Sequence, residues 1–370
     1  MITRIKLKSR PLLLISIYIV TQSACAKEFL IGADISAAAT LEKAGAVYRE
    51  NNEPNDLFTI LKDNGFNTVR LRLFVNPNKE YIVTNDLPYT IALAKRTKEH
   101  NMKLLLNFHY SDTWADPQKQ YKPAAWADMP FDELKKTVQS YTASVIETFK
   151  KENILPDMVQ VGNEITPGML WPDGRVGGDF ENDTQWEKFT SLLKAGIAGV
   201  RQGAGDANII IMLHIDQGGK KSVTKWFFDN INKRNVPYDI IGLSYYPWWH
   251  GKIEDLNDNL SYIATELKKD VIVVETGYPY AENFRMKSSD NPLFPLTPQG
   301  QYDFLYAVTK TVLNTPVNHG CGVFYWFPES VPLPGRPGRG GLGLFDPNGN
   351  VLPGAKAFAD AVKNQTKQHK

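Results

Sequence analysis

The segment Val159-Gln160-Val161-Gly162-Asn163-Glu164 is rich in β-branched apolar residues and ends in a carboxylate. The loop residues Ile165-Thr166-Pro167-Gly168 follow it directly. A second run, Val271-Ile272-Val273-Val274-Glu275, has the same form and is followed by Thr276-Gly277-Tyr278-Pro279. Buried parallel strands have this composition, and in a (β/α)8 barrel functional groups lie where strands pass into loops at the C-terminal face. The two segments therefore predict two carboxylates at one end of the same barrel.

Short apolar runs alternate with longer amphipathic stretches along the rest of the chain. The predicted strands are Phe29–Ala33, Thr68–Phe74, Lys103–Phe108, Met158–Glu164, Ile209–His214, Ile240–Tyr246, Val271–Glu275 and Val323–Trp326. The predicted helices are Pro88–Glu99, Phe131–Lys151, Gln185–Arg201, Ile253–Lys268, Pro298–Leu313 and Ala355–Val362. This alternation predicts an α/β fold, a single (β/α)8 TIM barrel over residues 27–370. An open doubly wound sheet is the alternative, but no glycine-rich phosphate loop follows the first strand.

The loops after the predicted strands are long and contain many Trp, Pro and Gly residues. They are Tyr110–Trp126, Thr166–Asp183, Pro247–Lys252, Gly277–Pro298 and Phe327–Gly349. Long loops at one end of a barrel form its binding face, so we expect these βα loops to form a substrate cleft.

Residues 1–26 have the features of a secretory signal peptide. Four basic residues and no acidic one occur there, an apolar run covers residues 11–20, and Ala24-Cys25-Ala26 supplies a cleavage site. We expect removal of residues 1–26 and a secreted protein, extracellular or periplasmic, with no transmembrane segment because the run is too short. Lipidation of Cys25 is the alternative, although Gln22 stands where an apolar residue would be expected.

The formal charge of the whole chain is +2, but without the basic residues of the signal it falls to −2. A mildly acidic protein has no electrostatic reason to bind nucleic acid, so we expect no nucleic-acid partner. We expect the protein to act as a monomer.

Enzymatic hydrolysis of a glycosidic bond generally requires two carboxyl groups, and this barrel end would supply them. The amide of Asn163 would donate a hydrogen bond to a sugar hydroxyl while Glu164, its pKa raised by burial, protonates the leaving oxygen. Glu275 would be the nucleophile, kept ionised by hydrogen bonds and positive charge. A salt-bridged surface position is the alternative for either glutamate by itself.

The second predicted strand contains Arg70 and Arg72, which strand alternation places on one face. If Leu71 and Leu73 pack under the helices, both arginines point into the barrel and need carboxylate partners there, because an unpaired buried cation is costly. A partly exposed edge strand is the alternative.

Several polar side chains follow the third and sixth predicted strands. His109 ends the third strand and starts a polar, aromatic segment with Asp112 and Trp114, which suggests contacts to substrate. A structural role is the alternative for His109. In the sixth strand, one of Tyr245 and Tyr246 can point inward, where it could bond the nucleophile.

Six tryptophans fall at strand ends or in the long loops: Trp114, Trp126, Trp171, Trp248, Trp249 and Trp326. Sugar rings stack their C–H faces on indole, so the cluster suits a polysaccharide, with Trp114, Trp248 and Trp326 as candidate contacts. Trp186 and Trp226 lie in predicted helices and are expected in the core.

Five segments together resemble family 53 glycoside hydrolases. They cover residues 66–73, 109–117, 161–171, 241–247 and 274–279. The resemblance implies an endo-β-1,4-galactanase that cuts the galactan of type I arabinogalactan, a pectin side chain, with retention of configuration. It implies Glu164 as acid/base and Glu275 as nucleophile, in agreement with the assignment above, and places Arg70 and His109 in the active-site framework. Retention predicts carboxyl groups about 5–5.5 Å apart.

The expected reaction requires no organic cofactor. Some bacterial members of this family hold a calcium ion in their last two loops, but we can match no ligand set here, so the metal site stays open. Two alternatives to a galactanase remain. One is a related barrel enzyme that cuts mannan, xylan or cellulose, and the other is a glycan-binding protein without catalysis at the cell surface.

Overall fold

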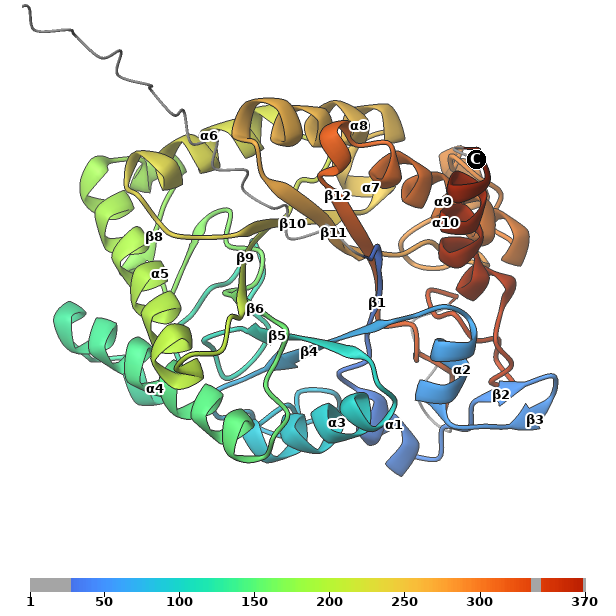
Figure 1. The fold of residues 1–370 in the computed structure, drawn as a ribbon, viewed down its shortest axis with the longest axis horizontal. Coiled ribbons are helices and arrows are strands. Elements are labelled where there is room, and N and C mark those ends of the chain that lie inside the picture. Colours follow the sequence, from blue (N-terminus) through green and yellow to red (C-terminus); the bar gives the residue numbers. More distant parts are fainter. Residues whose placement is uncertain (1–27, 334–340, 369–370) are drawn as a thin grey trace, which may run out of the picture.

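Eight parallel strands form a closed barrel in the computed structural model, which describes residues 28–333 and 341–368. The strands are β1 (Leu30–Asp34), β4 (Thr68–Leu73), β5 (Lys103–Phe108), β6 (Met158–Val161), β9 (Ile210–Ile215), β10 (Ile240–Tyr245), β11 (Asp270–Thr276) and β12 (Gly320–Trp326). β12 pairs with β1 and closes the ring (Figure 1). The predicted (β/α)8 barrel is confirmed.

Helices surround this barrel on the outside (Figure 1). They are α1 (Ala38–Lys43), α2 (Leu57–Asp63), α3 (Leu87–Glu99), α4 (Phe131–Lys151), α5 (Asp183–Ala204), α6 (Lys221–Lys233), α7 (Pro247–His250), α8 (Ile253–Tyr262), α9 (Pro298–Leu313) and α10 (Ala357–Gln368). Two short hairpins lie outside the barrel, β2 (Arg49–Glu50) with β3 (Glu53–Pro54) and β7 (Gly168–Met169) with β8 (Gly174–Arg175). Sequence analysis missed α1, α2, α6 and α7. The predicted helix over 253–268 divides into α8 and a π-helical turn, η3 (Ile263–Leu267).

Strand alternation separates the side chains that pack under the helices from those inside the barrel. On β5, Leu104 and Leu106 belong to the large outer core, whereas Leu105 belongs to a second apolar cluster. The buried members of that inner cluster are Leu105, Met158, Met212, Ile240, Ile272, Val274, Cys321 and Phe324. Nearer the C-terminal ends, the interior becomes polar. The buried polar residues there are Asp34, Arg70, Arg72, Asn107, Gln160, His214 and Ser244.

A β-bulge on β11 changes this alternation where it matters for function. Along the pairing of β10 with β11, Leu243 lies opposite Val273 but Ser244 lies opposite Glu275, so Val274 is the extra residue. Val274 packs in the inner apolar cluster, and Glu275 also lines the interior cleft. Bulges re-aim side chains in this way, and here the bulge turns Glu275 inward.

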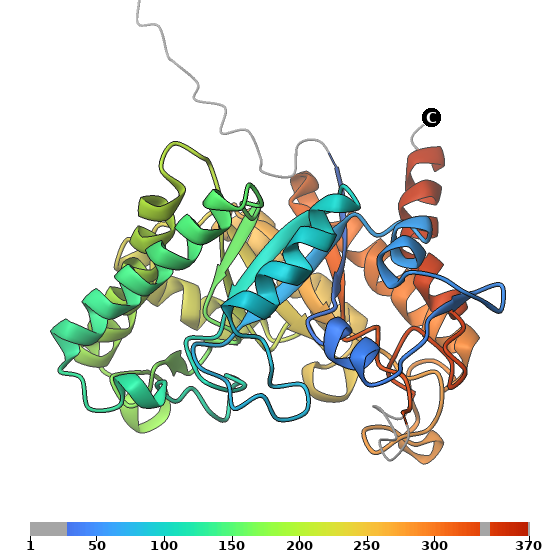
Figure 2. The same ribbon diagram turned by 90° about the horizontal axis from the view of Figure 1, so that it is seen from below.

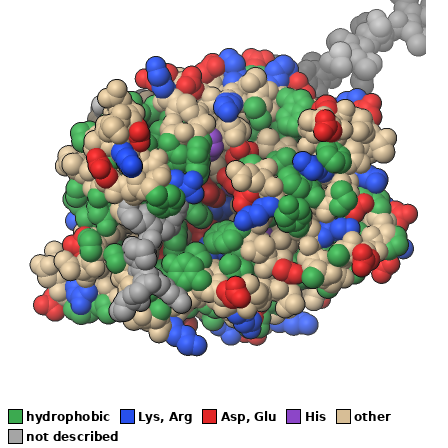
Figure 3. All heavy atoms as spheres, turned by 180° about the vertical axis from the view of Figure 1, so that it is seen from behind, with side chains coloured by type: hydrophobic (Ala, Val, Ile, Leu, Met, Phe, Trp, Pro, Cys, Tyr) green, Lys and Arg blue, Asp and Glu red, His purple; other side chains and the backbone are tan. Residues whose placement is uncertain are grey.

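The loops that follow the strands gather at one end of the barrel, at the bottom of Figure 2. The face at that end is hollowed near its centre, and acidic, basic, histidine and hydrophobic side chains surround the hollow (Figure 3). Among the described helices, none combines the length and apolar character needed to span a membrane.

Candidate active site

A cleft of about 570 Å³ opens at the C-terminal end of the barrel. Its lining includes most of the predicted site residues: Arg70, Arg72, His109, Trp114, Asn163, Glu164, Tyr246, Trp248, Glu275 and Trp326. Side chains from distant parts of the sequence therefore meet in one cavity, as the barrel topology predicts.

Glu164 reaches the cleft through a tight backbone turn after β6. Gly162 and Glu164 both have positive φ angles, +84° and +46°. A Cβ atom on Gly162 would lie 2.5 Å from Cγ2 of Ile165, so glycine is required at that position. The Gln120 amide holds the turn by donating to the carbonyl oxygens of Asn163 (2.7 Å) and Glu164 (3.2 Å). A non-glycine residue with positive φ is strained, and such strain often marks a functional site.

Glu275 is 7% exposed, and both of its carboxylate oxygens accept hydrogen bonds. Arg70 Nη1 donates to Oε2 at 2.9 Å, and the Tyr246 hydroxyl donates to Oε1 at 3.1 Å. Both interactions stabilise the ionised carboxylate.

Arg70 connects Glu275 to the polar interior of the barrel. Its Nη1 also contacts Asp34 Oδ2 at 3.1 Å, and its Nη2 donates to Asn163 Oδ1 at 2.7 Å. Its Nε donates to Gln160 Oε1 at 3.2 Å. The two carboxylates neutralise the buried cation, as sequence analysis required, and the network fixes the position of Asn163 beside Glu164. One N–H of the Asn163 amide donates to the carbonyl of Ala115 at 2.9 Å.

Arg72 supports an aromatic wall of the cleft. Its Nη1 lies 3.7 Å from Asp34 Oδ1, and its Nε donates to Asn85 Oδ1 at 3.0 Å. The guanidinium carbon lies 4.2 Å from the centroid of the Trp114 ring, a cation–π contact. Trp114 meets Trp326 edge to face at 6.1 Å. Arg72 therefore orients the indole that faces the cleft.

His109 lies beside this wall, where its ring contacts Trp114 at 6.1 Å edge to face. Its Nδ1 accepts the backbone N–H of Ala115 at 3.0 Å. Burial, with the nearby charges of Arg70 and Arg72, lowers the pKa of His109 well below its ordinary value, so the ring is neutral.

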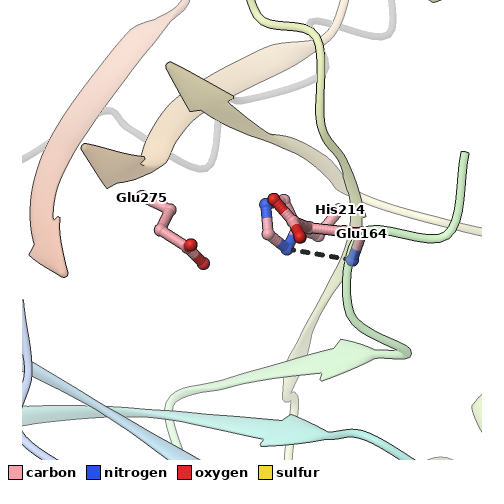
Figure 4. A group of neighbouring side chains, drawn as sticks. All are labelled: Glu164, His214 and Glu275. Atoms are coloured by element: carbon pink, nitrogen blue, oxygen red, sulfur yellow. Dashed lines mark hydrogen bonds between the residues drawn. The ribbon is translucent and has the colours of Figure 1, made fainter. Parts of the chain in front are cut away.

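A chain of hydrogen bonds runs from His214 through Ser244 to Glu164. The backbone N–H of Glu164 points at His214 Nδ1 at 3.4 Å (Figure 4), which makes Nδ1 an acceptor and places the ring proton on Nε2. His214 Nε2 lies 2.9 Å from Ser244 Oγ, and Ser244 donates to Glu164 Oε1 at 2.7 Å. Burial lowers the pKa of His214 well below its ordinary value, which agrees with this neutral tautomer. Glu164 Oε1 is thus an acceptor, and a proton on this acid belongs on Oε2.

The two glutamates face each other across the cleft (Figure 4). Three atoms lie within 4.8 Å of one another: one carboxylate oxygen of Glu164, one of Glu275 and a ring nitrogen of His214. Burial and the negative charges of Glu275 and Asp216 raise the pKa of Glu164 well above its ordinary value. Burial also raises the pKa of Glu275, but there Arg70 and the Tyr246 hydroxyl act in the opposite direction. The pair therefore has the asymmetry of an acid beside a carboxylate.

Two predicted site residues lie elsewhere. Asp112 joins two loops, because its carboxylate accepts the backbone N–H groups of Asn76 and Ala124, both at 2.9 Å. Tyr245 is on the outward face of β10, where its ring stacks on Phe304 at 6.3 Å. Alternation on β10 turns Ser244 inward and Tyr245 outward, and Tyr246, just beyond the strand, brings its hydroxyl back to Glu275.

The loop tryptophans divide in a similar way. Trp114, Trp248, Trp249 and Trp326 line the cleft, whereas Trp126 is buried against Tyr141. Trp171 contacts Tyr121 outside the cleft. Trp186 is in the core as predicted, and Trp226 is partly buried and packs against the core.

Sequence analysis missed Asp34, Gln160, His214 and Ser244, which support the two glutamates. Each has a signal that could have been used, since each stands near the end of a predicted strand at an inward position. The same alternation argument that selected Arg70 would have selected them.

Within the described residues, the one group of three or more side chains able to converge on a metal ion is Glu164, His214 and Glu275. Both ring nitrogens of His214 are engaged in hydrogen bonds. In the last two loops, Asp346 Oδ1 accepts the backbone N–H groups of Asn348 and Asn350 at 2.8 and 2.9 Å, as expected for a β-turn. The described carboxylates of those loops do not fit a calcium site; residues 334–340 lie outside the described part.

Comparisons with known proteins agree with this geometry. The model of glycosyl hydrolase family 53 matches residues 30–358. An uncharacterized protein of Niallia circulans is 41% identical over 358 residues, 91% of this chain and 95% of the relative. An endo-β-1,4-galactanase of Bacillus subtilis is 35% identical over 320 residues, 83% of this chain and 71% of the relative. The solved family 53 catalytic domain from Ignisphaera aggregans superimposes with a TM-score of 0.82 at 34% identity, covering 89% of this chain and 95% of that domain.

Proposed function

This chain belongs to glycosyl hydrolase family 53, and we propose that it cleaves internal β-1,4-galactosidic bonds of galactan, including the galactan of type I arabinogalactan. The observation that carries the proposal is the pair of opposed glutamates with unlike surroundings at the base of the cleft. The galactanase of Bacillus subtilis supports the choice of substrate.

In the first step, a carboxylate oxygen of Glu275 attacks the anomeric carbon of the bound galactosyl unit. The bond from that carbon to the leaving oxygen breaks, and Glu164 transfers its Oε2 proton to this oxygen. The product is a galactosyl ester of Glu275 and a free chain end. Arg70 and Tyr246 each bond one oxygen of Glu275, so they hold the nucleophile in position.

In the second step, the ionised Glu164 removes a proton from a water molecule. The resulting hydroxide attacks the anomeric carbon, the ester bond breaks, and Glu275 leaves as a carboxylate. Because Glu164 must donate a proton in one step and accept one in the next, its pKa has to respond to the charge of Glu275. The repulsion between the two carboxylates supplies that response, because formation of the ester removes one negative charge.

The spacing of the carboxylates supports retention of configuration. Carboxyl groups about 5–5.5 Å apart leave room for direct attack, whereas inverting enzymes need roughly 6.5–9.5 Å to admit a water molecule. One carboxylate oxygen of Glu164 lies within 4.8 Å of one of Glu275, which favours the shorter, retaining spacing.

The lining of the cleft suits a neutral sugar chain. Trp114, Trp248 and Trp326 offer indole faces on which C–H faces of galactose can stack. We propose that Asn163, His109 and the arginine network orient the sugar hydroxyl groups over the glutamates.

Product analysis tests this function. The purified protein should release short galacto-oligosaccharides from linear β-1,4-galactan and leave mannan, xylan and cellulose intact. Following the anomeric configuration of the first products by NMR should show the β form before mutarotation. If the protein cleaves only mannan, xylan or cellulose, that polysaccharide would take the place of galactan as the proposed substrate. No cleavage of any of them, with binding retained, would favour a glycan-binding protein.

The proposed reaction uses the side chains of this protein and water, so we propose that it needs no organic cofactor and that the monomer is active. Residues 1–26 lie outside the described residues. We retain the proposal that they direct export and are removed, with lipidation of Cys25 as the alternative.

A further inference from the structure

One wall of the cleft continues from the nucleophile to the rim as a row of aromatic rings. The ring of Tyr246, whose hydroxyl bonds Glu275, lies 5.1 Å from Trp248 and 5.6 Å from Trp249. Beyond Trp249 lies Arg285, from the loop between β11 and α9. Its guanidinium carbon is 4.7 Å from the centroid of Trp249 and 4.8 Å from that of Phe284.

Arg285 differs from Arg70 and Arg72, the other arginines of the cleft, because it forms no ion pair with a carboxylate of the described residues. All Asp and Glu residues of the chain lie within residues 28–333 and 341–368, and none of them forms an ion pair with Arg285. Within the same ranges its guanidinium makes no hydrogen bond either. Arg70 and Arg72, by contrast, are paired with Asp34.

The backbone around Arg285 is held in a tight turn. Asn283 Oδ1 accepts the N–H groups of Arg285 (2.7 Å) and Met286 (3.1 Å), and the N–H of Asn283 donates to the carbonyl of Met286 at 3.0 Å. Met286 is buried with 6% of its surface exposed, which anchors the turn. Phe284 and Trp249 are 70% and 49% exposed, so this part of the wall faces solvent.

A stacked guanidinium leaves its edge free, and that edge presents N–H donors in a fork that matches a carboxylate. Neutral galactan carries no charge for this cation. A uronic acid unit offers both a C–H face for Trp249 and a carboxylate for Arg285. We propose that Arg285, stacked between Trp249 and Phe284, binds the carboxylate of an acidic sugar unit that adjoins the neutral galactan chain. This inference rests on the proposed function and extends it to the composition of the substrate.

Three oligosaccharides test the inference. One is a linear β-1,4-galacto-oligosaccharide, the second is the same chain with a galacturonate unit at its terminus, and the third is the second with its carboxyl group reduced to an alcohol. Chains with the acidic unit at the reducing terminus and at the non-reducing terminus should both be compared. The measurement is kcat/KM for the wild-type protein and Arg285→Ala at low and high salt.

We expect Arg285→Ala to lower kcat/KM for the acidic chain about fivefold at low salt, the effect of an exposed ion pair. The values for the neutral and carboxyl-reduced chains should not change, and salt should abolish the difference. Equal losses on the acidic and the reduced chains would overturn the inference in favour of a contact to hydroxyl groups. No change on any chain would also overturn it.

Arg175→Ala is the matched control. Arg175 is stacked in the same manner, 4.3 Å from Trp171 and 4.5 Å from Phe180, but it lies outside the cleft lining. This variant should keep the wild-type preference for the acidic chain. If the wild-type protein cleaves none of the chains, the proposed function fails, and calorimetric binding of the acidic and reduced chains to wild type and Arg285→Ala still tests the inference by itself.

Discussion

The two halves of the barrel interior are built by opposite rules. In the N-terminal half, Met212, Ile240 and Ile272 pack against one another with 0–2% of their surface exposed. In the C-terminal half the same strands carry Ser244, His214 and Glu275, which are also buried, but each of them makes hydrogen bonds: His214 with Ser244, and Glu275 with Tyr246. Removing apolar surface from water stabilises the fold, whereas removing ionisable groups from water costs free energy that their pairing only partly returns. The comparison assigns stability to the apolar half and chemistry to the polar half.

Replacing Glu275, the proposed nucleophile, should have the largest effect. Glu275→Ala should lower kcat by a factor on the order of 10⁴ or more, since no other group can form the ester. With an activated galactoside, added azide should restore turnover and give a product of inverted configuration, because the small anion fills the vacated space and attacks directly. Glu133→Gln, on the exposed first turn of α4, is the control and should keep full activity. A Glu275→Ala protein with a tenth of wild-type activity would contradict the mechanism.

A substitution in the apolar half should affect stability instead. Met212 is fully buried, so Met212→Ala should lower the free energy of unfolding by about 2–5 kcal/mol through lost burial and a cavity. Urea denaturation measures this change, and kcat per folded molecule at low temperature should stay near the wild-type value. If kcat instead falls in proportion to stability, the two halves do not act separately.

The pH dependence of activity should respond to two neighbours of Glu164 in opposite directions. The proposed first step requires protonated Glu164, so we expect activity to fall as pH rises through the pKa of this acid. The hydrogen bond from Ser244 lowers that pKa and the charge of Asp216 raises it. Ser244→Ala should therefore move the alkaline limb of the pH–activity profile, where activity falls, to higher pH. Asp216→Asn should move this limb to lower pH.

We also expect Ser244→Ala to lower kcat about tenfold, the size of one hydrogen bond to a charged group. The measurement is kcat/KM against pH for both variants and the wild-type protein, with Ser244→Thr as the conservative control. Limbs that shift in the same direction would contradict the assigned roles of the two neighbours.

The smallest expected effect is a gain in stability. The folded-state pKa of Glu164 is raised, so this carboxyl favours folding below the unfolded-state pKa and loses that contribution as pH rises through the folded value. Glu164→Gln removes the penalty of a buried charge and should raise the melting temperature at neutral pH. At pH 3 the melting temperatures of the variant and the wild type should coincide, and a lower value for the variant at neutral pH would show that Glu164 supports the fold.

Much of the site could be predicted from local patterns. Strand alternation placed Arg70 and Arg72 inside the barrel, and the strand-to-loop boundaries selected Glu164 and Glu275. The same reasoning allowed one of Tyr245 and Tyr246 to point inward but left open which one, because it did not fix which face of β10 forms the interior; the structure selects Tyr246. It also gave no account of Glu275, which would face outward beside Val273 if β11 were regular. The bulge at Val274 arises from the pairing of β11 with β10, and this pairing cannot be predicted from the residues of β11 alone.

The sequence by itself determined the fold class, the family and the placement of the two glutamates at one end of the barrel. Each of these depends on short-range periodicity or on the order of residues within a motif. Tertiary structure decided which groups surround those glutamates. Ser244 and His214 bond Glu164 across 80 and 50 residues of chain, and Arg70 bonds Glu275 across 205. The two carboxyl groups have different environments because each is surrounded by different long-range neighbours and is buried. Closure of the barrel brings those neighbours together and removes the carboxyl groups from water.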